Sequence, residues 1–227
     1  MQHINLQHFL DLELEYFEPV NIRRGGWSGV ARVEFADQAY FIKRQVNHTY
    51  RNPSRFFLKS PTLRREYNNF LKLKNLSIGT PEIILYAEDG ADAMMVTREL
   101  TGFIDLNTYL SRVTATEPRR QVFTCLTEII LRIHSNNLHH GCLYGKHVMV
   151  DEAKPTNIAL IDLEKMKFAP RKRYNACKDV SQLIRQTQGM FDSERNQILS
   201  AYESKFPGFR TDLEKDLKKK SYRHTPS

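Results

Sequence analysis

The segment His140-Gly141-Cys142-Leu143-Tyr144-Gly145-Lys146-His147 and the later segment Leu160-Ile161-Asp162-Leu163 decide how this chain is interpreted. The first segment follows a stretch with the spacing of a buried helix and precedes a short apolar strand, so its polar side chains are expected on a loop held by rigid elements. Asp162 ends an apolar strand, a place where carboxylates that bind Mg²⁺ are commonly presented. A helix or turn cap is the ordinary alternative for Asp162, and the residues alone leave both open.

Three upstream features could also contribute to a phosphate site. Gly25, Gly26 and Gly29 lie in a turn between two expected strands, where glycine permits a phosphate to approach the backbone closely. Lys43 lies on an expected strand, on the face that would carry its ammonium toward the same cavity. Glu66 lies in the following helix, where its carboxylate could pair with Lys43. The alternatives are an ordinary hairpin, an exposed strand lysine and a solvated helix charge.

The spacing of apolar residues predicts an α+β fold of two lobes. Strands are expected between Val20 and Gln45 and over 83–87 and 93–97, with a polar, basic connection containing Pro53 and Pro61 and then a helix capped by Thr62. Residues 1–100 would form a β-rich lobe with one helix, 97–102 a hinge, 101–215 a mostly helical lobe, and 216–227 a basic flexible tail. The last two helices of the C-terminal lobe are expected over 179–188 and 193–205. A cleft between the lobes is the natural ligand site.

Composition restricts the partners and the compartment. The 227 residues include 34 Lys or Arg and 26 Asp or Glu, for a net charge of +8, which favours an anionic partner. No motif typical of nucleic-acid binding is present, so nucleic acid is not expected. No apolar run is long enough to span a membrane and the N-terminus lacks the pattern of a cleaved signal, so a cytoplasmic protein is expected. The three cysteines are widely spaced, which argues against a disulfide framework or a structural zinc site.

Taken in order, these pieces resemble the protein-kinase-like fold: a Gly-rich loop, a strand lysine, a helix glutamate, a catalytic loop and a metal-binding aspartate. Within that superfamily the sequence is most similar to the lipopolysaccharide core kinase family, the WaaP and InaA-like proteins. The resemblance covers roughly residues 20–205. It rests on the strings Tyr40-Phe41-Ile42-Lys43-Arg44, Leu63-Arg64-Arg65-Glu66-Tyr67, His140 through His147 and Leu160-Ile161-Asp162-Leu163.

The resemblance implies a role for each matching residue. Lys43 would contact the α- and β-phosphates of ATP with Glu66 as its ion-pair partner, under a cover formed by Gly25, Gly26 and Gly29. Backbone groups of Glu99 and Leu100 would bind adenine, and Asp105 would reach the ribose. Asp162 and His147 would bind Mg²⁺. The residues that would support the catalytic loop are His140 and the buried Asp179.

Cys142 occupies the position of the catalytic aspartate, which orients and deprotonates the acceptor hydroxyl. A thiol is mostly neutral at pH 7 and accepts protons poorly, so slow transfer is expected rather than none. The short stretch between Asp162 and Asp179 leaves no room for a peptide-docking segment. The resemblance therefore implies an ATP-dependent kinase of a sugar hydroxyl in the lipopolysaccharide inner core.

The alternative implied by Cys142 is a pseudokinase or regulatory binding module. Basic clusters at Arg51, Arg55 and Lys59, and at 64–65, 119–120 and 171–173, are either solvated faces or guides for an anionic acceptor. Such an acceptor would be presented at the inner face of the cytoplasmic membrane. The protein could also make peripheral contact with this membrane face.

Overall fold

The computed structural model describes residues 13–17, 19–23, 25–52 and 58–221. The chain divides into two compact units, the first formed by residues up to 68 and 81–100, the second by residues 69–80 and from 101 onward. The division after Leu100 lies within the expected hinge. Residues 69–80 were expected in the first lobe but group with the second unit.

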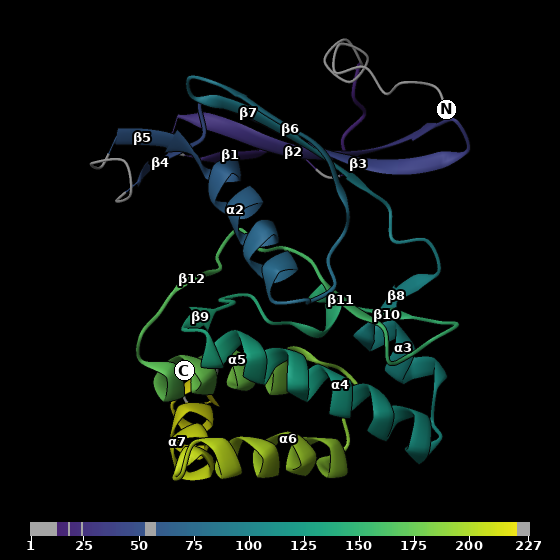
Figure 1. Ribbon diagram of the computed structural model, residues 1–227, viewed down its shortest axis with the longest axis vertical. Coiled ribbons are helices and arrows are strands. Elements are labelled where there is room, and N and C mark those ends of the chain that lie inside the picture. The colour runs from purple at the N-terminus through teal and green to yellow at the C-terminus, as the bar shows by residue number, and fades with distance from the viewer. Residues whose placement is uncertain (1–12, 18, 24, 53–57, 222–227) are drawn as a thin grey trace. The chain divides into compact units, whose positions relative to one another are not determined.

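The first unit is built on a five-stranded antiparallel sheet in the order β1-β2-β3-β7-β6 (Figure 1). Alternate residues of β3 point to opposite faces of this sheet. One face carries a core cluster that includes Tyr40 and Ile42. Lys43 therefore lies on the other face, and the expected strands are confirmed as β1 (Asn21–Arg23), β2 (Gly26–Phe35), β3 (Gln38–Val46), β6 (Ile83–Asp89) and β7 (Asp92–Arg98).

The segment expected as a polar connection contains a second, two-stranded sheet. Strand β4 (Thr49–Asn52) pairs with β5 (Leu58–Pro61). The prolines suggested a loop, but Pro61 stands at the end of its strand, where a missing N–H is tolerated. Helix α2 (Thr62–Asn75) follows and includes Thr62, which was expected to cap it from outside. Its first turn is capped from β3, because the side-chain oxygen of Gln45 accepts the Leu63 N–H at 2.8 Å.

Two small antiparallel sheets carry the loops of the second unit. Strands β8 (Phe103–Asp105), β10 (Val148–Asp151) and β11 (Ile158–Leu160) form one sheet in the order β11-β10-β8. Strand β9 (Leu138–His139) pairs with β12 (Lys167–Phe168) in the other. The short helix α3 (Leu106–Arg112) follows β8, and the 3₁₀ turn η2 (Gly145–His147) precedes β10.

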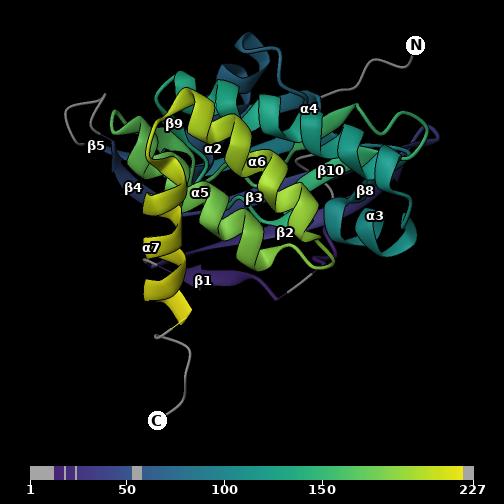
Figure 2. The same ribbon diagram turned by 90° about the horizontal axis from the view of Figure 1, so that it is seen from below.

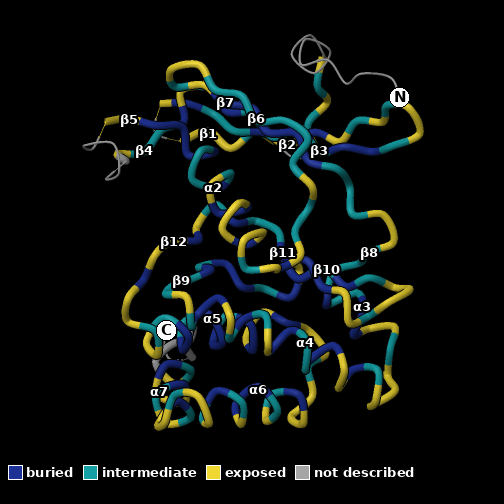
Figure 3. Tube along the Cα trace, in the orientation of Figure 1, coloured by how far each residue is buried: buried dark blue, intermediate teal, exposed yellow. Residues whose placement is uncertain are grey.

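Four longer helices complete the second unit: α4 (Thr116–Ser135), α5 (Lys172–Gln186), α6 (Asp192–Lys205) and α7 (Phe209–Ser221). Figure 2 shows α4, α5 and α6 side by side with α7 at their end. Each helix has a buried stripe and an exposed one, as the colours of Figure 3 show. No helix in the described part of the chain is long and apolar enough to span a membrane.

Two expectations about the C-terminal region are wrong. Helix α5 begins at Lys172, seven positions before the expected start at 179, because its first turns are polar and carry no apolar stripe. Residues 216–221 were expected in a flexible tail but belong to α7, which buries Phe209 and Leu213 among many lysines. Residues 222–227 lie outside the described residues.

Candidate functional site

The expected pair of Lys43 and Glu66 forms within the first unit. Lys43 lies opposite Val30 of β2 and Met95 of β7 in the sheet. Its Nζ lies 2.6 Å from Oε2 of Glu66, on the first half of α2, and the two side chains are 18% and 6% exposed. A charge-assisted bond between groups this well buried fixes the direction of the ammonium. Its role toward phosphates remains a prediction.

The glycines occupy a tighter hairpin than expected. Only Gly25 lies in the turn, with φ of +77°, whereas Gly26 and Gly29 belong to β2. A Cβ on Gly26 would lie 2.3 Å from the Val46 carbonyl oxygen, and one on Gly29 would lie 2.5 Å from the Tyr16 ring. Close packing alone explains these two glycines. The turn borders an open pocket of about 320 Å³ whose lining is mainly apolar: Tyr16, Val20, Ile22, Gly25, Gly26 and Trp27.

Two of the expected nucleotide contacts are already occupied. The Glu99 N–H donates to the Ala39 carbonyl at 2.9 Å, so this N–H is not available to adenine. Hydrogen bonds from the Arg32 guanidinium lower the pKa of the Glu99 carboxyl. Asp105 caps α3, because one of its oxygens accepts the N–H groups of Asn107 and Thr108 at 3.0 and 3.2 Å. The cap accounts for Asp105 without ribose, and the backbone of Leu100 remains a predicted contact.

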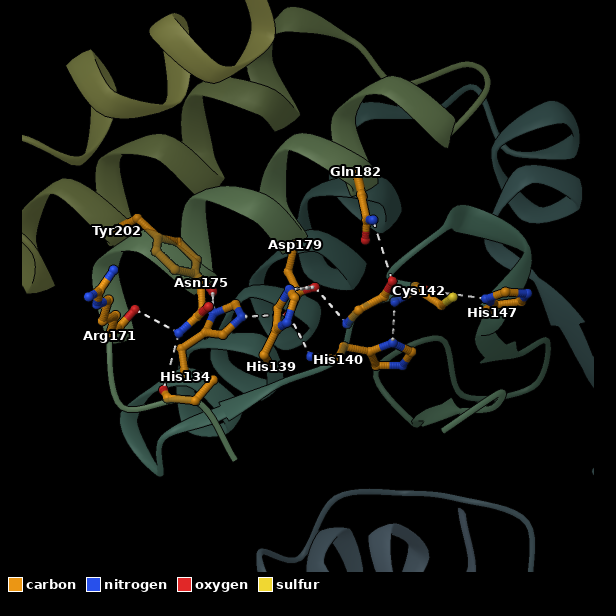
Figure 4. A network of polar contacts seen from close by, with 12 residues as sticks. His134, His139, His140, Cys142, His147, Arg171, Asn175, Asp179, Gln182 and Tyr202 are labelled. Atoms are coloured by element: carbon orange, nitrogen blue, oxygen red, sulfur yellow. Dashed lines mark hydrogen bonds and ion pairs between the residues drawn. The ribbon is translucent and has the colours of Figure 1, made fainter. Parts of the chain in front are cut away.

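Asp179 of α5 anchors the catalytic loop of the second unit. Its carboxylate accepts the backbone N–H groups of His140 at 2.7 Å and Gly141 at 2.9 Å. It also contacts Nε2 of His134 at 3.0 Å and Nε2 of His139 at 3.1 Å. Figure 4 shows Asp179 pointing from its helix into this ring of donors. Burial acts to raise the pKa of Asp179, but the two histidines more than offset it and the pKa is lowered.

His140 is held neutral inside the loop. Its side chain is buried, and burial lowers its pKa to about 4. Its Nδ1 accepts the Cys142 N–H at 3.3 Å, an interaction that requires an unprotonated nitrogen. The predicted supporting positions of His140 and Asp179 are therefore brought together by the fold.

The Cys142 thiol is only 2% exposed, at the position where the family pattern has an aspartate. Burial and the nearby Asp162 raise its pKa, although Lys165 and Tyr144, its polar neighbours, act in the opposite direction. The thiol is thus protonated near neutral pH and cannot serve as a general base. Sequence reasoning missed Lys165, because the Lys165 position matches no element of the catalytic motif.

Asp162 and His147 lie together beside this thiol. Asp162 has φ of +56°, and its side chain is 36% exposed. Such a strained backbone is common at functional sites. His147 Nδ1 lies 2.8 Å from the Cys142 carbonyl and 3.5 Å from Asp162 Oδ2. A carbonyl only accepts, so Nδ1 carries the proton and cannot bind a metal.

The side chains of Asp162 and His147 can be compared with the ligands of Mg²⁺, an ion that prefers oxygen ligands and keeps several bound waters. The exposed carboxylate of Asp162 suits that ion. Because Nδ1 of His147 carries the proton, its Nε2 has the lone pair, so His147 remains a predicted metal ligand through Nε2. The described residues contain no cluster of three or more His, Cys, Asp or Glu that could hold a metal. A bound ion would therefore complete its coordination with water and phosphate oxygens.

A buried asparagine fixes the turn that follows Asp162. The Asn69 amide is fully buried and donates to the carbonyls of Leu163 at 2.9 Å and Met166 at 2.8 Å. The Met166 N–H also closes the turn on the Leu163 carbonyl at 3.1 Å. Asn69 was not predicted as a site residue, because its partners lie far along the chain. The turn carries Lys165 to the catalytic loop.

Three comparisons place this geometry among known proteins. The lipopolysaccharide kinase (Kdo/WaaP) family model matches residues 7–202. Protein InaA of Escherichia coli (strain K12) is 25% identical over 203 residues, which cover 86% of this chain and 94% of that protein. A crystal structure of an aminoglycoside-3'-phosphotransferase of type VIII is 14% identical, with a TM-score of 0.58, covering 88% of this chain and 93% of that chain. The chain therefore has a protein-kinase-like fold and belongs to the lipopolysaccharide kinase (Kdo/WaaP) family of phosphotransferases.

Proposed function

We propose that the protein transfers the γ-phosphoryl group of ATP to a sugar hydroxyl of the lipopolysaccharide inner core, with Mg²⁺ as the metal. The single observation that carries the proposal is the buried 2.6 Å pair of Lys43 and Glu66, in a chain whose family uses such a lysine on nucleotide phosphates. A lysine held in one direction by a carboxylate is suited to bind an oxyanion repeatedly in the same place.

Lys43 of the first unit and Asp162 of the second have separate proposed roles. Lys43 would bind the α- and β-phosphates, and Asp162 would hold the metal with His147 orienting it through the 3.5 Å contact. When bound, Mg²⁺ neutralises charge on the phosphate oxygens. The acceptor hydroxyl oxygen forms the new bond to the γ-phosphorus while the bond to the β-phosphate bridging oxygen breaks, and ADP leaves with that electron pair.

The acceptor proton would pass to water or to a phosphoryl oxygen as the new bond forms, and not to Cys142, because the thiol is buried and protonated. Phosphoryl transfer has a loose transition state and depends mainly on positioning and charge. A missing general base lowers the rate by about 10²–10⁴-fold. Slow turnover is the consequence for this chain.

An anionic acceptor fits the charge on the β4–β5 hairpin. Arg51 and Lys59 lie directly opposite each other in this antiparallel pair, and both are exposed. Like charges in this arrangement repel, and an anion between them would relieve the repulsion. In two of the other basic clusters one arginine is paired with a carboxylate: Arg119 is buried against Glu194 at 2.9 Å, and Arg173 pairs with Asp212 at 2.8 Å. Arg55 lies outside the described residues. The hairpin is thus the surface proposed to meet the anionic core or the inner membrane face.

A second candidate function is a pseudokinase that binds nucleotide without useful transfer. The protonated thiol at position 142 is the observation that favours it. The two functions share the nucleotide site and differ only in turnover.

Thermal unfolding with ATP, in the presence and absence of Mg²⁺, tests the shared part. ATP at about 100 times its Kd would add about 2.7 kcal/mol to the free energy of unfolding. We expect a shift that needs Mg²⁺ and is lost in Lys43→Met and Asp162→Asn. Lys59→Met, on the hairpin, is the matched control and should keep the shift. No shift with wild-type protein would contradict both candidate functions.

A further inference from the structure

The ammonium of Lys165 lies beside the thiol at the position of the missing catalytic aspartate. Lys165 is exposed, and its polar neighbours in the second unit are Cys142, Tyr144 and Asp162. Within the described residues Lys165 forms no ion pair with a carboxylate at 4.0 Å or less. The nearby carboxylate of Asp162 acts on its charge, but Asp162 is the residue proposed to hold the metal.

The fold sets the position of the Lys165 backbone, from which the ammonium extends. Asn69 holds both ends of its turn, at the carbonyls of Leu163 and Met166. On the side of the catalytic loop, a Cβ at Gly141 would lie 3.1 Å from the Lys165 carbonyl oxygen and 3.2 Å from its Cβ. Only a glycine, here with φ of +79°, lets the turn pack this closely.

The residue at position 142 determines whether the charge of the neighbouring Lys165 is compensated. An aspartate there would pair with Lys165 and neutralise the ammonium. Cysteine supplies no carboxylate there, and the nearby Asp162 is the residue assigned to the metal. Lys165 is therefore a cation close both to the proposed metal ligand and to the position that would face the acceptor hydroxyl.

We propose that Lys165 contacts the γ-phosphoryl group of the bound nucleotide and stabilises the charge on its oxygens during transfer. This inference rests on the proposed function and adds a phosphate-binding residue to it. The transferred group would pass from a nucleotide whose metal Asp162 would hold to an acceptor hydroxyl facing position 142, and Lys165 neighbours both Asp162 and Cys142. Charge-assisted bonds from an ammonium to phosphate oxygens are about twice as strong as neutral ones.

Calorimetric titration with two nucleotides tests the contact without requiring turnover. The probes are Mg²⁺ with ADP and Mg²⁺ with adenylyl-imidodiphosphate, which differ by the γ-phosphoryl group. In Lys165→Met we expect affinity for the triphosphate analogue to fall about tenfold, as the loss of one charge-assisted bond predicts, while ADP affinity changes less than about twofold. Lys165→Arg should keep the preference for the triphosphate. Lys167→Met, an exposed lysine on β12, is the matched control and should change neither affinity.

The results of the titration distinguish a failure of the Lys165 contact from a failure of the proposed kinase function. Wild-type protein that binds both nucleotides, with the same affinity ratio in Lys165→Met, would overturn the Lys165 contact and leave the proposed function standing. Equal weakening of both nucleotides would also overturn it, because the γ-phosphoryl group would then not be the group contacted. Wild-type protein that binds neither nucleotide would overturn the proposed function and the inference together. Because Lys165 is exposed, neither variant is expected to unfold.

Discussion

The carboxylate of Asp179 accepts the backbone N–H of His140 at 2.7 Å, and this bond ties helix α5 to the loop that carries Cys142. Asp179 is fully buried, so its charge is compensated only by the donors of that loop and by His134 and His139. The loop is therefore a rigid platform.

Asp179→Asn should lower the free energy of unfolding by about 3–5 kcal/mol, because it removes a buried charge on which three hydrogen-bond donors and the nearby His139 ring converge. Urea denaturation measures the change. Asp162→Asn is the matched control: this side chain is 36% exposed and asparagine tolerates its positive φ, so stability should change by less than about 0.5 kcal/mol. Equal losses in both variants would refute the anchoring role of Asp179.

The buried His140 predicts a loss of stability on mild acidification. Its pKa is about 4 in the folded protein because of burial, and close to 6.5 in the unfolded chain. The unfolded state therefore binds more protons between these values. The contribution is complete above pH 6.5 and is lost as pH falls through this window, by about 2 kcal/mol from pH 7 to pH 5. Denaturation at both pH values should show a shallower fall for His140→Gln, which can still accept the Cys142 N–H; an identical fall would contradict this assignment.

Gly141→Ala tests the packing of the Lys165 turn against the catalytic loop. Gly141 and Gly102 both have φ of +79°, but a Cβ at Gly102 would meet nothing within 4 Å. Backbone strain should cost each alanine variant about 1 kcal/mol. Gly141→Ala should cost at least about 1 kcal/mol more, because the Lys165 backbone must move. Equal costs, measured by urea denaturation, would show that the turn is not in close contact with the loop.

The Cys142→Asp variant tests how much a carboxylate at position 142 would contribute to the rate of phosphoryl transfer. Lys165 would supply a counter-charge for a new carboxylate, so the substitution should be tolerated despite burial. A general base at this position should raise kcat for phosphoryl transfer at least about tenfold. Cys142→Ser, which adds no charge, is the control and should stay within about threefold of wild type. A Cys142→Asp variant no faster than wild type would show that transfer here does not use a base at position 142.

Local sequence patterns predict the parts of the site that lie on regular elements. Lys43 alternates along a strand and Glu66 falls in a helix, so their pairing follows from periodicity and from the kinase-like order of motifs. Asn69 and Lys165 carry no such signal, because the contacts that define them join α2 to a turn about a hundred residues later. Helix α7 escaped prediction because two buried apolar residues stand among charged ones. Asp105 caps α3, which accounts for the residue without a ligand, so its contact with ribose stays a prediction.

The most direct test of the account is transfer of labelled phosphate from γ-³²P-ATP to lipopolysaccharide whose inner core has been chemically dephosphorylated. The account predicts slow, Mg²⁺-dependent labelling of the carbohydrate by wild-type protein. It also predicts faster labelling by Cys142→Asp and none by Lys43→Met or Asp162→Asn. Nucleotide binding without labelling by either wild-type protein or Cys142→Asp would contradict the claim that this chain is a working sugar kinase.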